Sequence, residues 1–238
     1  MAISFHTFGD GAMLINFEQK IEQEINNQVH LLATRIESAN FSFVNYITPA
    51  YCSITIAFDK SQINFTDLKE QINGIESEIN SLDIIPRKLY IPVCYDRSFA
   101  LDLEDIMKQT GLSASEIIEK HTSILFRVYM IGFLPGFPYL GTLPVEMECS
   151  RKAVPRLEVP GGAVGLAGLQ TGIYPKGSPG GWQIIGNTPI NLIGANKINP
   201  FLFQAGDEVQ FYSISKSKHK SIIEAQKEGK FNWANVYE

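Results

Sequence analysis

Glycine and proline crowd into one part of this chain. Residues 132–189 hold 12 of the 19 glycines and 8 of the 12 prolines. Such enrichment predicts disorder when the other residues are polar, but large apolar side chains run through the same stretch, including Val164, Leu166, Trp182 and Ile184. Short apolar strands joined by tight glycine and proline turns are typical of a closed or nearly closed barrel. The sequence therefore predicts a β-barrel in its second half.

One segment of this region, residues 132–144, reads GFLPGFPYLGTLP. Its prolines exclude a regular helix or a central strand, and its aromatic side chains are unlike those of a flexible linker. We expect a rigid apolar loop at the rim of the barrel cleft, because prolines pre-order a loop and reduce the entropy lost on docking. Partner binding is assigned to Phe133, Pro135, Phe137 and Tyr139.

The alternative for residues 132–144 is a packed structural loop that has no partner. Exposure of Phe137 and Tyr139 together would argue against that alternative, since contiguous exposed apolar side chains mark interaction sites.

The first part of the chain shows alternating strand and helix patterns. Apolar residues recur at every second position in residues 12–18 and at spacings of three and four in residues 21–36, which predicts a strand followed by a helix. Two strands over residues 43–48 and 51–59, a helix over 64–79 capped by Thr66, and a closing strand over 87–96 complete the pattern. This β-α-β-β-α-β order is typical of a ferredoxin-like arrangement. Because it carries no ligand signature, we expect a scaffold or docking domain.

Two short helices are expected next, over residues 102–111 and 113–122. Gly111 provides a C-cap for the first, and Ser113 with Glu116 forms a capping box for the second. Strands are predicted over residues 123–133 and 205–215, followed by a charged tail that forms a surface strand or helix. The expected fold class is therefore α+β, with a ferredoxin-like domain in residues 1–95 and a β-barrel domain in residues 96–238.

Composition excludes several classes of protein. A net charge of −5 argues against a nucleic-acid or anionic-membrane binder, which needs a basic face. No apolar run of about 18 residues is present, so no membrane span is expected. The first residues, MAISFHTFGD, lack the basic and apolar regions of a signal peptide. The three cysteines fit no zinc spacing, so we expect reduced thiols in a cytoplasmic protein without a metal.

Familiar catalytic motifs are missing from the sequence. It contains neither G-x-x-x-x-G-K-[ST] nor G-x-G-x-x-G, which are the common phosphate cradles. G-x-S-x-G and H-E-x-x-H are also absent. These absences argue against a free-standing nucleotide hydrolase.

Residues 151–189 combine cationic, amide and hydroxyl side chains with many glycines. The polar residues are Arg151, Lys152, Arg156, Lys176, Gln170, Thr171 and Tyr174. Glycines allow backbone N–H groups to approach a bound oxygen closely, so this stretch suits a carboxylate, an amide oxygen or a developing oxyanion. The alternative is that the glycines form barrel corners and the cations are solvated.

Three long motifs resemble one known family: YMIGFLPGFPYLGTLP, PRLEVPGGAVGLAGLQTGIYP and SPGGWQIIGNTP. This family contains the B subunit of bacterial ATP-dependent 5-oxoprolinase, the sporulation kinase inhibitor KipI and allophanate hydrolase subunit 1-like modules. The opening FGDGAMLINFEQKI is similar to the start of the family, so the resemblance covers roughly the whole chain. It departs from the family pattern at Ala163, where a serine is usual, and at Ser150, where a proline is usual.

The resemblance implies a cyclophilin-like barrel and a role as the B subunit of a 5-oxoprolinase complex. Such a complex uses ATP to open the lactam of 5-oxo-L-proline to L-glutamate, and its A and C subunits would be the partners of this chain. ATP would be bound with or by those partners, and this chain alone would be inactive. The alternative is a KipI-like protein inhibitor of a sensor histidine kinase. A third possibility, a prolyl isomerase, follows from the barrel analogy alone and has no matching site pattern.

On the enzyme interpretation, we assign roles to six residues. His121 is the candidate general acid or base, and Arg127, six residues later, is expected to face the same cleft. Arg156 and Lys176 would bind a carboxylate or a transferred phosphate. Gln170 would orient the amide. In this assignment the catalytic residues are His121, Arg127 and Arg156, and the substrate-binding residues are Gln170, Thr171 and Lys176. The alternative for His121 is a satisfied residue near a helix C-terminus, where histidine is favoured.

Overall fold

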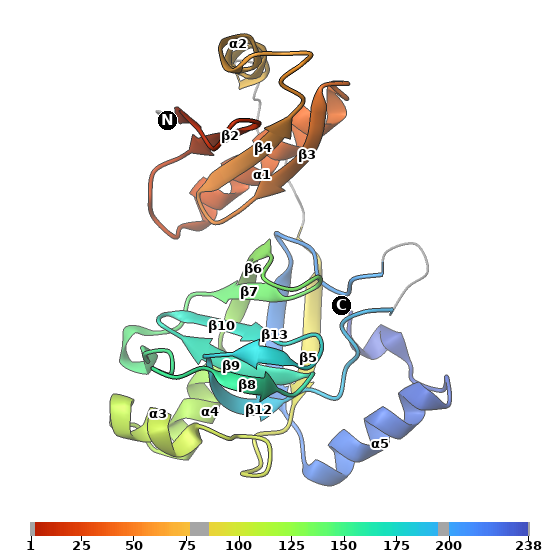
Figure 1. Ribbon diagram of the computed structural model, residues 1–238. Coiled ribbons are helices and arrows are strands. Elements are labelled where there is room, and N and C mark those ends of the chain that lie inside the picture. Colours follow the sequence, from red (N-terminus) through yellow and green to blue (C-terminus); the bar gives the residue numbers. More distant parts are fainter. Residues whose placement is uncertain (1–2, 77–85, 195–199, 238) are drawn as a thin grey trace. The chain divides into compact units, whose positions relative to one another are not determined.

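The computed structural model describes residues 3–76, 86–194 and 200–237. It is a mixed α/β structure that divides into two compact units, Met1–Ile85 and Pro86–Glu238 (Figure 1). The division falls in the segment before the strand that was expected to close the first domain.

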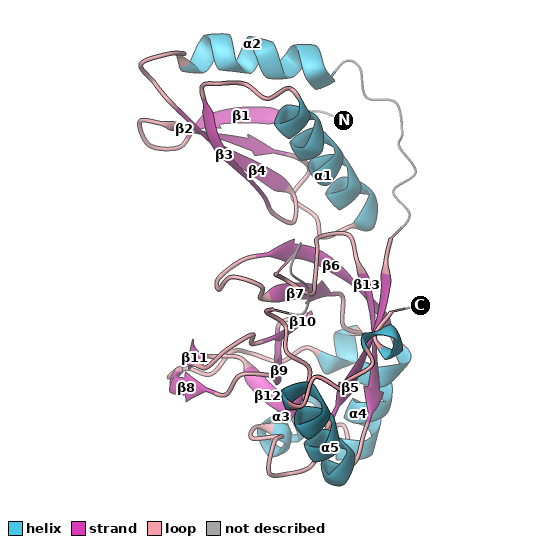
Figure 2. Cartoon of the chain, turned by 90° about the vertical axis from the view of Figure 1, so that its right-hand side faces the viewer, coloured by secondary structure: helices cyan, strands magenta, loops and turns pink. Residues whose placement is uncertain are grey.

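The first unit is a four-stranded antiparallel sheet with two helices (Figure 2). Its strand order is β1-β2-β4-β3, with β1 (Ser4–Thr7), β2 (Ala12–Asn16), β3 (Val44–Pro49) and β4 (Ser53–Phe58). The helices are α1 (Gln23–Ser38) and α2 (Phe65–Glu76). Alternate residues of β2 and β4, such as Met13 and Ile56, pack against the apolar stripes of both helices, including Val29 and Leu68. The predicted period-two strands and period-3.6 helices are confirmed.

Two details of the first unit differ from the expectation. An additional strand, β1, pairs with β2. The start of α2 is capped by Asn64 and not by Thr66, because the Asn64 side-chain oxygen accepts the Asp67 N–H at 2.9 Å. The last residues of the predicted helix, 77–79, lie outside the described residues.

The expected closing strand, β5 (Lys88–Val93), belongs to the second unit. It pairs in parallel with β13 (Glu208–Ser213), in register from Lys88 opposite Glu208. Leu89, Ile91 and Val93 on its inner face are fully buried in the core of that unit. Burial of this face within a single core explains why β5 completes the second sheet and not the first.

The second unit contains a seven-stranded sheet in the order β12-β9-β10-β7-β6-β13-β5. The remaining strands are β6 (Leu125–Ile131), β7 (Pro138–Gly141), β9 (Ala163–Ala167), β10 (Gln170–Ile173) and β12 (Gln183–Asn187). Next to the two edge strands, Cys94 and Asn187 exchange backbone hydrogen bonds of 2.9 and 3.0 Å. The sheet therefore curls, and its two edge strands, β12 and β5, come together at this bridge. A separate two-stranded ribbon is formed by β8 (Arg156–Val159) and β11 (Ser178–Gly180).

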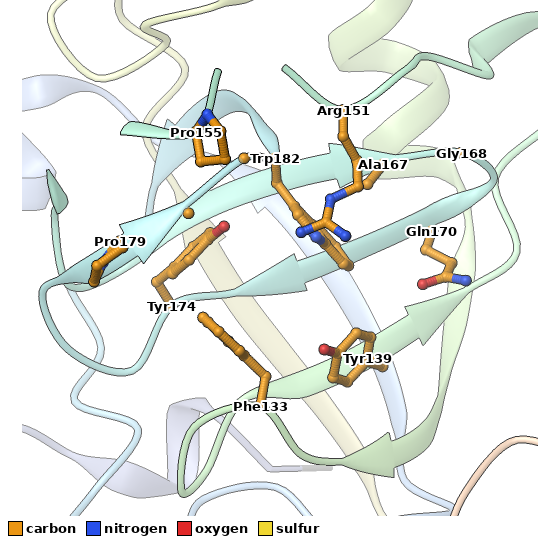
Figure 3. Close-up of a pocket in the computed structure, with 12 residues that line it drawn as sticks. Phe133, Tyr139, Arg151, Pro155, Ala167, Gly168, Gln170, Tyr174, Pro179 and Trp182 are labelled. Atoms are coloured by element: carbon orange, nitrogen blue, oxygen red, sulfur yellow. The ribbon is translucent and has the colours of Figure 1, made fainter. Parts of the chain in front are cut away.

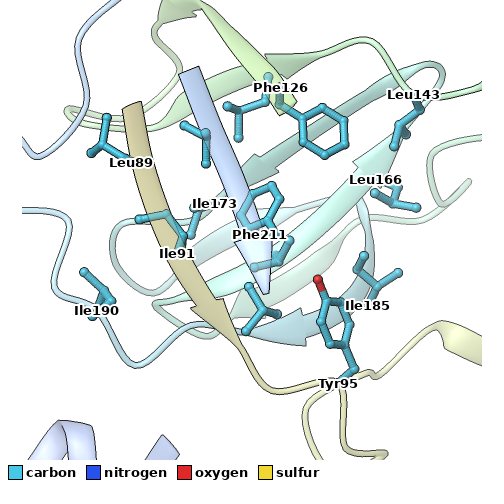
Figure 4. Close-up of a cluster of buried hydrophobic side chains, with 14 of the residues drawn as sticks. Leu89, Ile91, Tyr95, Phe126, Leu143, Leu166, Ile173, Ile185, Ile190 and Phe211 are labelled. Atoms are coloured by element: carbon cyan, nitrogen blue, oxygen red, sulfur yellow. The ribbon is translucent and has the colours of Figure 1, made fainter. Parts of the chain in front are cut away.

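Apolar side chains fill the interior of the curled sheet (Figure 4). Leu89, Phe126, Leu166 and Phe211 come from strands distant in the sequence and share one buried cluster. This buried cluster is the main core of the second unit, and its side chains pack closely, as in other protein interiors.

The described residues of the second unit also form three helices: α3 (Leu103–Thr110), α4 (Ala114–Ser123) and α5 (Lys216–Lys227). Short 3₁₀ turns lie at η1 (Val145–Met147) and η2 (Trp233–Asn235). The predicted caps are confirmed: Gly111 adopts φ +73° after α3, and Ser113 with Glu116 forms the capping box of α4. The charged tail is helical, and His219 of α5 contacts the Asn187 side-chain oxygen at 2.8 Å. Over the ranges that the structure describes, no helix is both long and apolar enough to cross a membrane.

Candidate functional site

A pocket of about 450 Å³ lies in the second unit, beside strands β7, β10 and β9 (Figure 3). Four aromatic side chains form much of its wall: Phe133, Tyr139, Tyr174 and Trp182. Glycine and proline residues contribute most of the rest, together with the two polar side chains of Arg151 and Gln170. The pocket is thus a concave, mostly apolar site with few polar groups, which is the usual make-up of a small-molecule site.

Strand pairing explains how the aromatic wall is assembled. Tyr139 on β7 lies opposite Gly172 on β10, and residues paired across a sheet point to the same face. A Cβ atom at Gly172 would lie 2.9 Å from the ring of Phe137, so glycine makes room for that ring. Phe137 in turn packs against Trp182, with 5.4 Å between ring centroids.

Phe133 has a strained backbone at the edge of the pocket. Its φ is +64°, in the left-handed region, which costs an L-residue roughly 1–2 kcal/mol. Its side chain is 60% exposed and makes an edge-on contact with Phe137 at 5.6 Å. Because strain of this kind clusters at functional sites, Phe133 is a candidate ligand-contacting residue.

Among the described residues that line the pocket, one is a cation and none is acidic. Burial raises the pKa values of Tyr139 and Tyr174, and the positive charge of Arg151 acts in the opposite direction on both, although with a smaller effect. The backbone N–H of Trp182 also donates to the Tyr174 hydroxyl. Arg151 therefore lies close enough to both phenols to act on them electrostatically, and the pocket is suited to an anion or a polarised oxygen.

Asp102, at the start of α3, binds two of the four cations that the sequence analysis grouped in residues 151–189. Arg156 donates to both of its oxygens, at 2.5 and 2.8 Å, and Lys152 donates at 2.8 Å. The Ile184 N–H donates to the same carboxylate at 2.7 Å. Burial alone would raise the pKa of Asp102, but these hydrogen bonds outweigh it and hold the pKa below its usual range. Arg156 thus ties the β8–β11 ribbon to α3 and β12.

His121 lies in the core and not at the rim of a cleft. Tyr95 contacts its Nδ1 at 2.8 Å, and its Nε2 lies 3.0 Å from the Thr171 hydroxyl oxygen. Since Thr171 donates its only hydroxyl proton to the Gly165 carbonyl, Nε2 must carry the proton and Nδ1 must accept from Tyr95. His121 is therefore a neutral, fully hydrogen-bonded core residue that links α4 to β9 and β10, which agrees with the alternative of a satisfied histidine.

We expect the His121 imidazole to remain neutral from pH 8 down to about pH 4. Burial lowers its pKa to about 3, whereas an unfolded histidine has a pKa of about 6.5. As the pH falls below that value, the unfolded chain takes up a proton that the native state does not. The free energy of unfolding should then fall by up to about 1.4 kcal/mol per pH unit because of this residue.

The measurement is an NMR titration of the imidazole, together with urea unfolding between pH 7 and pH 4. The variant His121→Gln should lose this part of the pH dependence. An imidazole titration midpoint between pH 5 and pH 8 would contradict the assigned hydrogen-bond chain.

Arg127 does not share a face with His121. It follows Phe126 on β6, and the Phe126 ring lies 5.3 Å from the His121 ring. Neighbouring strand residues point to opposite faces, so Arg127 points away from His121. Burial lowers the pKa of Arg127. Thr171 is fully buried and contacts His121 in the core. Lys176 is exposed and does not belong to the pocket lining.

Of the six residues assigned to catalysis and substrate binding, Gln170 alone lines the pocket. The loop residues assigned to partner binding divide in a similar way. Phe133 and Pro135 are exposed, Tyr139 is half-buried in the pocket wall, and Phe137 is 1% exposed. Phe137 and Tyr139 are therefore not exposed together, because Phe137 packs in the aromatic cluster.

Sequence reasoning did not assign Arg151, Tyr174 or Trp182 to the site. Arg151 and Tyr174 were named among the polar residues of 151–189 without a role, and Trp182 was counted among the apolar residues. Tyr174 and Trp182 lie 23 and 31 positions after Arg151. Such separations give no periodic signal, so only the fold brings these three residues together. In the part of the chain that the structure describes, no three His, Cys, Asp or Glu side chains gather as a possible metal site.

Residues 3–203 match the family model described as "Carboxyltransferase domain, subdomain C and D". The chain belongs to this family. It is 38% identical over 227 residues to the 5-oxoprolinase B subunit of Bacillus subtilis, and the match covers 91% of this chain and 95% of that protein. It is 34% identical over 206 residues to the 5-oxoprolinase B subunit of Escherichia coli O157:H7, covering 87% and 94% respectively. The resemblance seen in the three motifs is thereby confirmed.

A solved structure agrees with the fold. The crystal structure of TTHA0988 superposes with a TM-score of 0.75 at 32% identity and covers 86% of this chain. The match spans 39% of the TTHA0988 chain, so this protein corresponds to about two fifths of that longer chain.

Proposed function

We propose that this chain is the B subunit of an ATP-dependent 5-oxoprolinase complex, which converts 5-oxo-L-proline to L-glutamate together with the A and C subunits. The observation that carries the proposal is the similarity to curated 5-oxoprolinase B subunits over most of the chain, at 34% to 44% identity. In the proposal the curled sheet is a cyclophilin-like barrel, the first unit is a ferredoxin-like docking domain, and the complex is cytoplasmic, where ATP is available.

The pocket supports this proposal because its size and lining suit a small cyclic amide. A lactam is a poor electrophile, and the closed ring is favoured at equilibrium. Transfer of a phosphoryl group from ATP to the lactam oxygen would make the carbonyl carbon electrophilic. Water addition, cleavage of the C–N bond and hydrolysis of the resulting acyl phosphate then give glutamate, ADP and phosphate.

This chain's part in that reaction is to hold the lactam. Gln170 lines the pocket, and its side-chain amide offers a donor and an acceptor that match those of a lactam. The aromatic walls exclude water around the ring. The sequence contains neither common phosphate-binding motif, so ATP is assigned to the partner subunits, either alone or jointly with this chain.

Exposed apolar side chains near the pocket are proposed to contact a partner protein of the complex. Phe133 and Pro135 are exposed in the loop before β7. Leu157 on β8 is 92% exposed, and Val154, two residues before the start of β8, is 80% exposed. Apolar side chains exposed to this extent on neighbouring segments are typical of an interface that a partner covers.

The test is ATP-dependent glutamate formation from 5-oxo-L-proline. We expect no activity from this chain alone and activity when it is mixed with its partner subunits. Leu157→Asp should prevent co-elution of the subunits and abolish the activity, whereas Val145→Asp, which alters a residue of similar exposure on η1, should leave both intact. A complex that assembles but forms no glutamate would overturn the proposed substrate.

A further inference from the structure

Arg151 is distinguished from the other cations of the second unit by what surrounds it. Arg156 and Lys152 are bound to Asp102, and Lys176 lies outside the pocket lining. Arg151 lines the pocket, and no carboxylate within residues 3–76, 86–194 and 200–237 lies at ion-pair distance from it. An arginine beside aromatic walls without a counter-ion is available for an external anion.

Gln170 is the second polar residue of the pocket lining. It lines the same pocket, and its side-chain amide has no hydrogen-bond partner among the residues that the structure describes. In Figure 3 the Arg151 guanidinium points into the pocket beside Trp182, and the Gln170 amide projects from β10 beside Tyr139. The pocket therefore presents one cationic group and one amide group to a volume of about 450 Å³ that has aromatic walls.

We propose that Arg151 binds the carboxylate of a small cyclic amide acid in this pocket, and that it determines the preference for that acid over a neutral lactam. The proposal rests on the proposed function, which supplies the lactam. A guanidinium binds a carboxylate through two parallel hydrogen bonds, while Gln170 pairs with the lactam amide and the aromatic side chains pack against the ring.

Charge supports the same assignment. The described lining contains no acidic side chain, so nothing within it repels an anion. The chain as a whole has a net charge of −5, so attraction of an anion to this pocket depends on a local cation and not on the overall charge. Removal of Arg151 should therefore remove the selectivity for an anion and leave the apolar contacts in place.

Trp182 provides a direct reporter of occupancy. The chain has two tryptophans. Trp182 lines the pocket. Trp233, the first residue of η2, packs against Phe231, with 5.1 Å between the ring centroids. Two indole N–H signals are expected in a ¹H–¹⁵N spectrum, and the variant Trp233→Phe assigns them. Binding in the pocket should shift the Trp182 signal and leave the Trp233 signal in place.

The experiment titrates the full chain with 5-oxo-L-proline and, separately, with 2-pyrrolidinone, which has the same ring without the carboxylate. We expect saturable shifts of Trp182 and a preference of at least about tenfold for the acid. Arg151→Gln should bind both compounds with nearly equal affinity. The matched control Arg97→Gln, which alters an exposed arginine outside the pocket lining, should keep the preference.

Three results would overturn the inference: no saturable shift of Trp182, an equal affinity for both compounds in the unaltered chain, or an unchanged preference in Arg151→Gln. Failure of the proposed function gives a different result. In that case the chain binds the acid through Arg151, but the assembled complex forms no glutamate. Conversely, an active complex whose KM for 5-oxo-L-proline is unaffected by Arg151→Gln would reject the role of Arg151 and retain the proposed function.

Discussion

Replacing Asp102 with alanine should lower the free energy of unfolding of the second unit by about 3–5 kcal/mol, the usual cost of removing one partner of a buried ion pair. The Asp102 carboxylate is almost completely buried and accepts hydrogen bonds from Arg156, Lys152 and the Ile184 N–H. Its loss leaves the Ile184 N–H without a partner and detaches the β8–β11 ribbon from α3. Urea unfolding at pH 7 measures the change.

The matched control is Asp105→Ala, one turn further along α3. The Asp105 side chain is half-exposed and meets Lys152 at 3.4 Å and Lys108 at 3.8 Å, so its removal should change the free energy of unfolding by no more than about 0.5 kcal/mol. If Asp102→Ala were within about 1 kcal/mol of the unaltered chain, the ion-pair cluster would not stabilise the fold as inferred.

Asp102 also determines in which direction the free energy of unfolding changes with pH. Because the native pKa of Asp102 lies below its usual range, the unfolded chain takes up a proton at this residue first as the pH falls. The stabilisation is therefore fully present above about pH 4 and is lost progressively as the pH falls through the native pKa. The difference in stability between the unaltered chain and Asp102→Ala should shrink over that range.

Gly162→Ala should lower the free energy of unfolding by about 2–5 kcal/mol, from two separate effects. Gly162 adopts φ +78°, which costs an alanine roughly 1–2 kcal/mol. A Cβ atom there would also lie 2.3 Å from the Thr188 carbonyl oxygen, and overpacking of this kind adds about 1–3 kcal/mol. The backbone cannot move away easily, since Gly162 forms hydrogen bonds with Tyr174 and Thr188.

Thermal and urea unfolding of Gly162→Ala should be compared with Gly229→Ala. Gly229 has a similar φ of +68°, but a Cβ atom there would meet nothing within 4 Å. That control isolates the cost of the backbone conformation, which should be roughly 1–2 kcal/mol. Equal losses in the two variants would show that the close approach to Thr188 is relieved by small shifts.

Local patterns were sufficient to predict most individual elements. The stripes of residues 21–36 and 64–79 predicted α1 and α2, and the signals at Gly111 and Ser113 predicted the ends of α3 and α4. These succeed because amphipathic period and capping depend on residues within a few positions of one another. The barrel expectation also succeeded in outline, since tight turns between short apolar strands constrain the sheet to curl.

Sheet membership could not be predicted in the same way. Residues 88–93 read as a strand, but the sequence does not state which sheet they join. The partner of β5 is β13, some 120 positions later, and the choice depends on which core buries Leu89 and Ile91. Strand pairing at this separation is decided by tertiary packing, because the local sequence of a strand does not specify which distant strand it pairs with.

The site shows the same division between local and tertiary information. The sequence by itself determined that residues 132–189 form a rigid, apolar, glycine-rich region with several cations, and its long motifs determined the family. Only the tertiary structure decided which polar groups are free to bind a ligand: Asp102 engages Arg156, the core encloses His121, and Arg151 is left facing Trp182. The physical reason is that a side chain's availability depends on burial and on partners contributed by distant segments, and neither is encoded in its own neighbourhood.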